Sequence, residues 1–314
     1  MSRTARWTAD QLPDLSGRTV IITGGNSGLG FEAARALAPR GAELVLACRD
    51  LSKAKAAIAE IEAEAPGAAV EAMQLDLASL ASIRAFAESF LETQRQLHVL
   101  CNNAGVMAIP YRKTADGFEM QLGTNHLGHF ALTALLLPRL LDTPGSRVVN
   151  VSSNAHYFGK MRFDDLHWER GYSKWRAYGQ SKLANLLFTY ELQSRLDAAG
   201  SGVLAAACHP GYAATNLQGA GARMVGSSSQ ERFWELSNRL LSQSAAMGAL
   251  PTLYAAAAPQ LRGGDYIGPD GWFAQAGHPT LARSSPRARD PVAAAKLWDV
   301  SESLTDTRFD ALRR

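Results

Sequence analysis

The 314-residue chain has few cysteines, no signal-peptide pattern and no long apolar run. Its longest apolar runs, 131–138 and 245–258, fall short of the ~20 residues that span a bilayer, and residues 1–17 hold no apolar core. We therefore expect a cytoplasmic protein without a transmembrane segment. An odd number of widely spaced cysteines in or beside apolar runs predicts free buried thiols and no disulfide framework. They are Cys48, Cys101 and Cys208.

The chain also has little excess charge: its net charge is +3, and its arginines form no long run. Nucleic-acid binding requires a basic stripe, so we expect no nucleic-acid partner. The 46% of hydrophobic residues supplies a buried core and argues against disorder. His126 and His129 stand three residues apart without a third ligand at matching spacing. We expect packing and hydrogen bonding from them and no metal site.

Short apolar runs alternate with longer segments of helical spacing. The runs are continuous, as in strands covered on both faces, so the alternation predicts an α/β fold with a doubly wound parallel sheet, the Rossmann fold. Strands are expected at Thr19–Thr23, Glu43–Ala47, Val70–Leu75, His98–Cys101, Arg147–Val151 and Val203–Cys208. Helical segments are expected at Leu29–Pro39, Leu51–Ala65, Ser79–Gln94, Gly117–Leu141 and Ala177–Ala199.

The pattern predicts a single domain. Residues 1–16 form an N-terminal extension, 17–268 the domain, with the sheet running to about Gly268, and 269–314 a C-terminal extension. Ligands of open α/β sheets bind beyond the carboxyl ends of the strands. The segment after the sixth strand, about 211–250, is therefore expected to cover the substrate. Three arginines of the extension are expected to form a solvated face: Arg283, Arg287 and Arg289.

A glycine-rich turn follows the first strand directly and opens a helix. Glycines permit a tight turn and close approach to a pyrophosphate, and the helix start offers free N–H donors. The spacing is Gly-x-x-x-Gly-x-Gly, which differs from the common Gly-x-Gly-x-x-Gly fingerprint. The turn predicts a dinucleotide site formed by Gly24, Asn26, Ser27, Gly28, Leu29 and Gly30.

The end of the second strand bears on the choice of dinucleotide. NAD-specific enzymes usually place an acid there for the ribose 2′-hydroxyl. This chain has Cys48 followed by Arg49, a cation suited to a 2′-phosphate, so NADP(H) is favoured over NAD(H). Asp50 leaves two alternatives open, because it can cap the next helix or contact the ribose.

Tyr178 and Lys182 lie four residues apart and share one helix face, so the phenol and the ammonium can enter one pocket. A neighbouring cation lowers the pKa of a tyrosine, which suits a general acid or base. Ser153 follows the fifth strand, where its hydroxyl can donate to a substrate oxygen or cap a turn. Asn125 stands inside a helical segment, where asparagine is unfavourable and a specific task is expected.

These motifs together resemble the short-chain dehydrogenase/reductase family. They occur in the family's order over about residues 17–268, and the stretches 47–50, 125–130 and 181–185 resemble its retinol dehydrogenase branch. The matching features are the Thr-Gly-x-x-x-Gly-x-Gly loop, Asp76, Asn102-Asn103-Ala104-Gly105, Asn125, Ser153, Tyr178 with Lys182, and His209-Pro210-Gly211.

The resemblance implies catalytic roles for four residues. Tyr178 is the acid/base, Ser153 polarises the carbonyl, and Lys182 binds the nicotinamide ribose and lowers the pKa of the tyrosine. Asn125 holds a water in the proton relay to Lys182. Family members commonly pair through the two helices that contain Asn125 and Tyr178, which implies a homodimer or homotetramer.

The resemblance also extends the cofactor site, with Asp76 on the adenine and Thr215 on the carboxamide. Beyond the glycine turn and Arg49, the expected cofactor residues are Asp76, Leu77, Asn103, Ala104, Gly105, Tyr178, Lys182, Pro210, Gly211 and Thr215.

We thus expect an NADP(H)-dependent oxidoreductase that interconverts a carbonyl and an alcohol on a fairly apolar small molecule. The similar protochlorophyllide reductases suggest a second hypothesis, reduction of a conjugated C=C bond. A third is a non-catalytic NADP(H)-sensing regulator, against which the intact Tyr178 argues.

Overall fold

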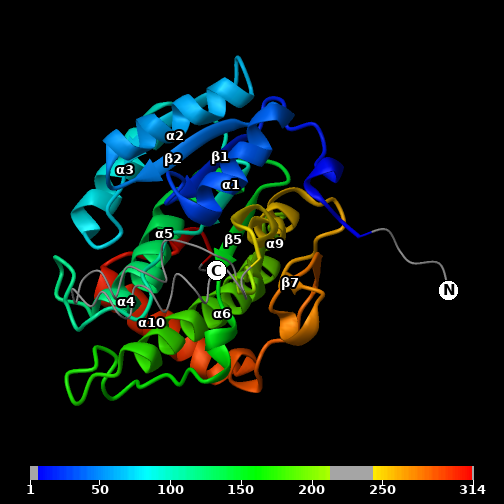
Figure 1. The fold of residues 1–314 in the computed structure, drawn as a ribbon. Helices are drawn as coiled ribbons and strands as arrows, with labels where there is room; N and C mark the ends of the chain where they lie inside the picture. The colour runs from blue at the N-terminus through cyan, green and yellow to red at the C-terminus, as the bar shows by residue number, and fades with distance from the viewer. Residues whose placement is uncertain (1–5, 213–242, 313–314) are drawn as a thin grey trace.

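A twisted sheet runs through the middle of the molecule in the computed structural model, which describes residues 6–212 and 243–312 (Figure 1). In these residues the sheet has eight strands in the order β3-β2-β1-β4-β5-β6-β7-β8. All neighbours are parallel except β7 and β8. The strands are β1 Thr19–Thr23, β2 Glu43–Cys48, β3 Val70–Gln74, β4 Val99–Asn102, β5 Arg147–Val151, β6 Leu204–Cys208, β7 Tyr266–Pro269 and β8 Pro279–Leu281. The fold is the predicted doubly wound Rossmann fold.

Helices cover both faces of the sheet, because alternate side chains of each strand point to opposite sides. Val20 and Ile22 of β1 pack in one cluster with α1, α2 and α9, whereas Ile21 packs in another with α3, α5 and α6. These helices are α1 Gly28–Leu37, α2 Leu51–Glu64, α3 Leu80–Glu92, α5 Gly128–Leu141, α6 Lys174–Ala198 and α9 Ala245–Ala257. The expectation of full coverage is wrong for β3, which lies at the sheet edge and is only partly buried.

The long segment predicted at Gly117–Leu141 divides into three parts. A single turn, α4 (Met120–Leu122), leads into a π-helical turn, η3 (Gly123–Leu127), and then into α5. π-Turns occur frequently at functional sites. Asn125 lies in this turn with its side chain fully buried.

The residues after Gly268 pack onto the domain. β8 extends the sheet beyond its predicted end by one antiparallel strand. Helix α10 (Pro291–Thr305) lies against α6 and α5, at the helix pair expected to join subunits (Figure 1). Its Trp298 contacts Phe130 and Phe188, and Ser301 Oγ is 2.9 Å from His126 Nε2.

The predicted substrate cover at 211–250 lies mainly outside the described residues. Its last residues, 245–250, begin α9, which packs against α1 in the core. The remaining described elements are short 3₁₀ turns. They are η1 Ala9–Gln11, η2 Ala38–Arg40, η4 Asn154–Tyr157, η5 Trp272–Ala274, η6 Pro286–Arg289 and η7 Asp310–Leu312.

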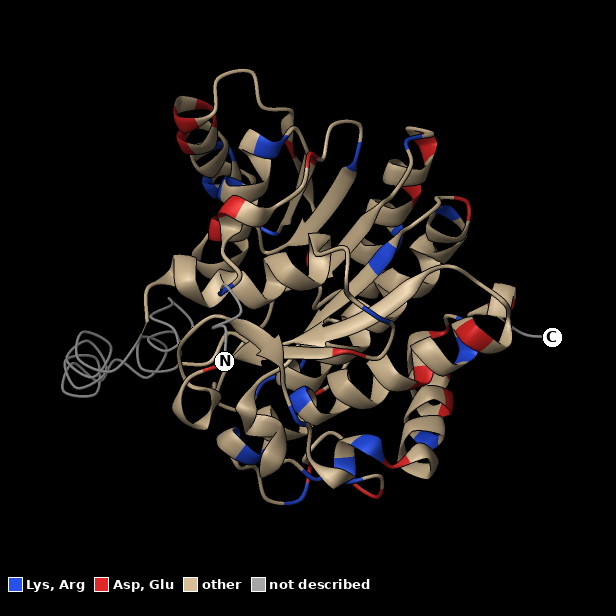
Figure 2. Cartoon of the chain, turned by 90° about the vertical axis from the view of Figure 1, so that its right-hand side faces the viewer, with Lys and Arg blue, Asp and Glu red and all other residues tan. Residues whose placement is uncertain are grey.

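Lysines and arginines are interspersed with acidic residues over the helices and loops that surround the sheet (Figure 2). Among the helices that the structure describes, none has the length and apolar character required to cross a membrane. The three arginines predicted to form a solvated face are all exposed, and two of them also contact the domain. Arg287 donates to Gly159 O at 3.1 Å, and the Arg289 guanidinium lies 4.9 Å from the centre of the Tyr190 ring.

Candidate active site

A cleft of about 1200 Å³ opens beyond the carboxyl ends of the strands, where the strand order reverses between β1 and β4. Open α/β sheets bind ligands at this point. Most of the predicted site residues line it, namely Gly24, Asn26, Ser27, Gly28, Leu29, Arg49, Asp76, Leu77, Asn103, Ala104, Gly105, Ser153, Tyr178, Lys182, Pro210 and Gly211. Gly30 and Asn125 lie behind this lining, and Thr215 lies outside the described residues.

The glycine loop brings backbone close to backbone. A Cβ placed on Gly30 would lie 2.5 Å from Gly24 O and 2.6 Å from Asn103 Nδ2, so a side chain there would displace the loop. Gly24 and Gly28 adopt φ values of +67° and +55°. In the described structure, the Ser27 side chain makes no capping hydrogen bond to α1. The N–H groups at the start of α1 therefore stay available to an anion.

Thr23 and Asn103 fasten the loop to the end of β4. Thr23 Oγ1 accepts hydrogen bonds from the N–H groups of Asn103 and Ala104, both at 2.9 Å, and Asn103 Nδ2 donates to Thr23 O at 2.8 Å. His129 Nε2 lies 2.9 Å from the same hydroxyl, while its Nδ1 is 3.1 Å from Asn125 O. The expected hydrogen-bonding role of the histidine pair is confirmed. The described residues include no group of three or more His, Cys, Asp or Glu that could hold a metal.

At the end of β2 the structure separates the roles of Arg49 and Asp50. The Asp50 carboxylate caps α2 by accepting from the N–H groups of Ser52 and Lys53, and its pKa is lowered first by the Ser52 hydroxyl and then by the Lys53 N–H. Of the two alternatives left open for Asp50, the structure therefore shows the cap. Arg49 is exposed at the cleft and makes no ion pair with any described residue. The Lys53 ammonium at the same end of the cleft lies 3.7 Å from the Asp50 carboxylate, so Arg49 carries the unpaired positive charge among the described residues there.

The catalytic candidates converge from β5 and α6. Ser153, Tyr178 and Lys182 line the same cleft, and Lys182 Nζ lies 5.8 Å from the centre of the tyrosine ring. Burial raises the pKa of Tyr178 to about 12, and the nearby Ser153 hydroxyl only partly offsets that rise. In the protein alone, desolvation of the phenolate dominates this pKa, and the lowering expected from Lys182 stays a prediction.

Lys182 is a buried cation without a carboxylate partner among the described residues. Its Nζ donates to Val151 O at 2.9 Å, and burial lowers its pKa to about 8. The same end of β5 is joined to α6 by Asn185 Nδ2, 3.0 Å from Val151 O, and by Ser152 Oγ, 2.8 Å from Lys182 O. These bonds fix the ammonium next to the cleft.

Asn125 clamps the loop that follows β4. Its Oδ1 accepts from Val106 N–H at 2.8 Å, and its Nδ2 donates to Val106 O and to Ser181 Oγ, each at 2.9 Å. A Cβ on Gly105 would lie 2.9 Å from Asn125 Oδ1 and 3.6 Å from Lys182 Nζ, so backbone, amide and ammonium meet at one point. The side chain therefore has the specific task expected of it, which is to hold the wall of the cleft beside Lys182.

Asn102 and Asp76 both hydrogen-bond within the protein, but only Asn102 is buried. Asn102 is buried and donates to Thr133 Oγ1 and to Asn150 Oδ1, so it links β4 to β5 and α5 and does not hold a loop around the cleft. Asp76 lines the cleft, and its carboxylate accepts from Ala78 N–H at 2.9 Å.

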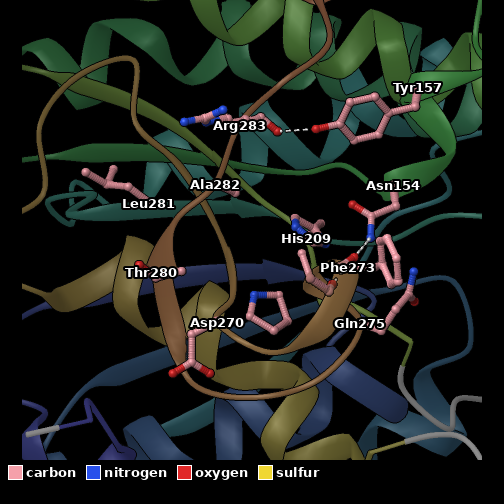
Figure 3. Close-up of a pocket in the computed structure, with 12 residues that line it drawn as sticks. Asn154, Tyr157, His209, Asp270, Phe273, Gln275, Thr280, Leu281, Ala282 and Arg283 are labelled. Atoms are coloured by element: carbon pink, nitrogen blue, oxygen red, sulfur yellow. Dashed lines mark hydrogen bonds between the residues drawn. The ribbon is translucent and has the colours of Figure 1, made fainter. Parts of the chain in front are cut away.

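The apolar part of the cleft was missed by sequence analysis. It is lined by side chains from three separate loops and the start of α6, which no local motif brings together. These residues are Val106, Met107, Phe158, Trp175 and Tyr212, with Gln275 beside them. A neighbouring pocket of about 490 Å³ shares Asn154 and Gln275 with the cleft (Figure 3).

A glycine loop at the switch point and a Ser–Tyr–Lys group in the same cleft define a Rossmann-fold oxidoreductase. The short chain dehydrogenase family model matches residues 18–225. Retinol dehydrogenase 12 from Homo sapiens is 46% identical over 298 residues, 94% of this chain and 89% of the relative. The chain belongs to the short-chain dehydrogenase family.

Solved structures agree with that assignment. An uncharacterised protein from Mycobacterium paratuberculosis has a TM-score of 0.80 and 48% identity, and the match covers 97% of this chain and 99% of that one. An NAD(P)-dependent gluconate 5-dehydrogenase from Beutenbergia cavernae, solved with NADP at low occupancy, has a TM-score of 0.62 and 26% identity. That match covers 81% of this chain and 95% of the other.

Proposed function

We propose that the chain is an NADP(H)-dependent oxidoreductase that interconverts a carbonyl and an alcohol on a fairly apolar small molecule. The observation that carries the proposal is that Ser153, Tyr178 and Lys182 line one cleft together with the glycine loop. The apolar side chains beside the tyrosine, among them Phe158 and Met107, support an apolar substrate. The name of the retinol dehydrogenase relatives is consistent with such a substrate.

The cleft fits a dinucleotide. Gly24 and Gly28 line the cleft at positive φ, and the uncapped start of α1 beside them would hold the pyrophosphate. Asp76 and Leu77 would border the adenine, and Asn103 to Gly105 the central part. Arg49 would pair with a 2′-phosphate, which supports NADP(H) over NAD(H). The NADP in the Beutenbergia cavernae structure supports the same class of cofactor.

The site residues can carry out the proton half of the reaction. When bound, the reduced nicotinamide supplies a hydride to the carbonyl carbon. Ser153 would donate a hydrogen bond to the carbonyl oxygen, and Tyr178, protonated because its pKa is about 12, would deliver the proton. Lys182 would bind the nicotinamide ribose and favour the phenolate that remains. Asn125 would support a water-mediated path that returns a proton through Lys182.

A panel of carbonyls and alcohols assayed with both NADPH and NADH tests the proposal. We expect all-trans-retinal or decanal to be reduced with NADPH and more slowly with NADH. Product analysis on an enone distinguishes the carbonyl from the C=C bond as the site of reduction. Turnover with no member of the panel, despite NADPH binding, would favour the sensing regulator and contradict the enzyme.

We further propose a cytoplasmic protein, since the three cysteines are free and buried, as in a reducing compartment. A homodimer or homotetramer remains a prediction. The contact of α10 with α5 and α6 indicates that pairing through those helices would have to include α10.

A further inference from the structure

The turn that carries Ser153 is bonded to a segment more than a hundred residues further along the chain. η4 (Asn154–Tyr157) begins directly after the serine, and three of its side chains bond to residues 273–285. Asn154 Nδ2 is 3.3 Å from Ala274 O, and the Tyr157 hydroxyl donates to Arg283 O at 2.7 Å (Figure 3). The catalytic half of the cleft therefore depends on the C-terminal segment for its support.

His156 makes the bond that reaches Ser153 itself. Its Nδ1 lies 2.7 Å from Ser153 O, and Ser285 N–H donates to its Nε2 at 3.1 Å. A carbonyl oxygen only accepts and a backbone N–H only donates, so the two partners fix one neutral tautomer with the proton on Nδ1. The ring is fully buried, and burial lowers its pKa, which keeps it neutral.

We infer that His156 is a positioning residue for the reaction, which holds the Ser153 backbone so that its hydroxyl faces Tyr178. The inference rests on the proposed function, because it takes Ser153 as the group that polarises the carbonyl.

The geometry around the serine explains why its backbone has to be held. Ser153 Oγ accepts from Ala155 N–H at 3.2 Å and lines the same cleft as Tyr178. The direction of this hydroxyl depends on the peptide that carries it. Misplacing a reacting group by about 1 Å can cost on the order of 10²-fold in rate. The His156 backbone N–H also donates to Ser153 O at 3.0 Å, so the ring adds a second bond that ties this carbonyl to Ser285.

The test replaces the His156 side chain with residues that keep none or only one of its two ring hydrogen bonds. His156→Ala should lower kcat for all-trans-retinal reduction about 10- to 100-fold, with KM for NADPH within about twofold of the parent. His156→Asn keeps an amide donor where Nδ1 stands and should restore most of kcat. His156→Gln reaches toward Ser285 only and should stay slow. Tyr157→Phe removes another bond of the same turn without touching Ser153, and should leave kcat within about twofold.

A double-mutant cycle separates positioning from general support. If His156 acts through Ser153, then His156→Ala should slow the Ser153→Ala protein less than about threefold in single-turnover measurements. An equal slowing in both backgrounds, or rescue by Gln and not by Asn, would overturn the inference. A Ser153→Ala protein with parental kcat would instead remove the proposed role of the serine. Thermal unfolding of each variant checks that the fold is retained.

Discussion

The two halves of the cleft hold their functional groups in different ways. In the nucleotide half, the groups are backbone N–H donors of the glycine loop and the exposed Arg49 side chain, all supplied by short local stretches. In the catalytic half, Tyr178 and Lys182 are buried side chains, and the bonds of His156 tie Ser153 to Ser285. Changes in the first half should therefore alter binding, whereas changes in the second should alter the rate and the stability.

Burial of the polar groups in the catalytic half lowers the free energy of unfolding. Burial of an ammonium without a counter-charge disfavours the charged form, which is why the pKa of Lys182 falls to about 8. The polar groups of the nucleotide half avoid this cost because they lie at the surface or at a helix start. The functional groups of the catalytic half therefore lower the stability of the fold, whereas those of the nucleotide half do not.

The largest effect is expected for Tyr178→Phe. Without the phenolic proton donor, kcat should fall about 10²- to 10⁴-fold. The Kd for NADPH should change little, because the ring stays in place. Stopped-flow turnover measures the fall in kcat, and fluorescence titration measures the Kd for NADPH. Retained turnover would mean that Tyr178 is not the proton donor. It would also contradict the expectation that changes in the catalytic half alter the rate.

Lys182→Met should abolish most activity and yet stabilise the protein. The pKa of Lys182 is lowered from its ordinary 10.5, so the cost is fully present below pH 8 and disappears above 10.5. At pH 7 the free energy of unfolding should rise by about 1–3 kcal/mol, since Val151 O keeps Asn185 as a donor. Urea unfolding at pH 7 measures this. A destabilised variant would mean that the ammonium supports the fold.

Arg49→Ala should affect binding alone. Loss of a charge-assisted bond to a 2′-phosphate should raise the Kd for NADPH about tenfold or more and leave that for NADH within about twofold. Lys55→Ala, an exposed change on α2 away from the cleft, is the matched control. Equal weakening of both dinucleotides would show that Arg49 does not select the phosphate.

The smallest effect is a pH dependence. Reduction requires the Lys182 ammonium, which is present below its pKa of about 8 and lost above it, whereas Tyr178 stays protonated to about 12. The value of kcat/KM for NADPH should therefore be level from pH 6 to 7.5 and then fall as the pH rises. A profile that stays level to pH 9.5 would mean that Lys182 keeps its proton or is not needed.

Local patterns were sufficient for much of the fold and for the nucleotide half. β1 and β5 begin and end as predicted, and the glycine loop lies between β1 and α1 as its spacing requires. The pairing of Ser153 with Tyr178 was also predictable, because both motifs fall where parallel strands and a helix meet. The pKa of Tyr178 was not, since it depends on how deeply the phenol is buried.

The strands as far as β6 and the glycine turn could be predicted from the sequence alone, since they follow from neighbours within a few residues. The same holds for the chemical types of the predicted site residues. Only the tertiary structure decided the π-turn around Asn125, the bond from His156 to Ser285, and the contact of α10 with α6. Each of these depends on packing between segments that lie far apart in the chain, which leaves no periodicity or spacing in the sequence.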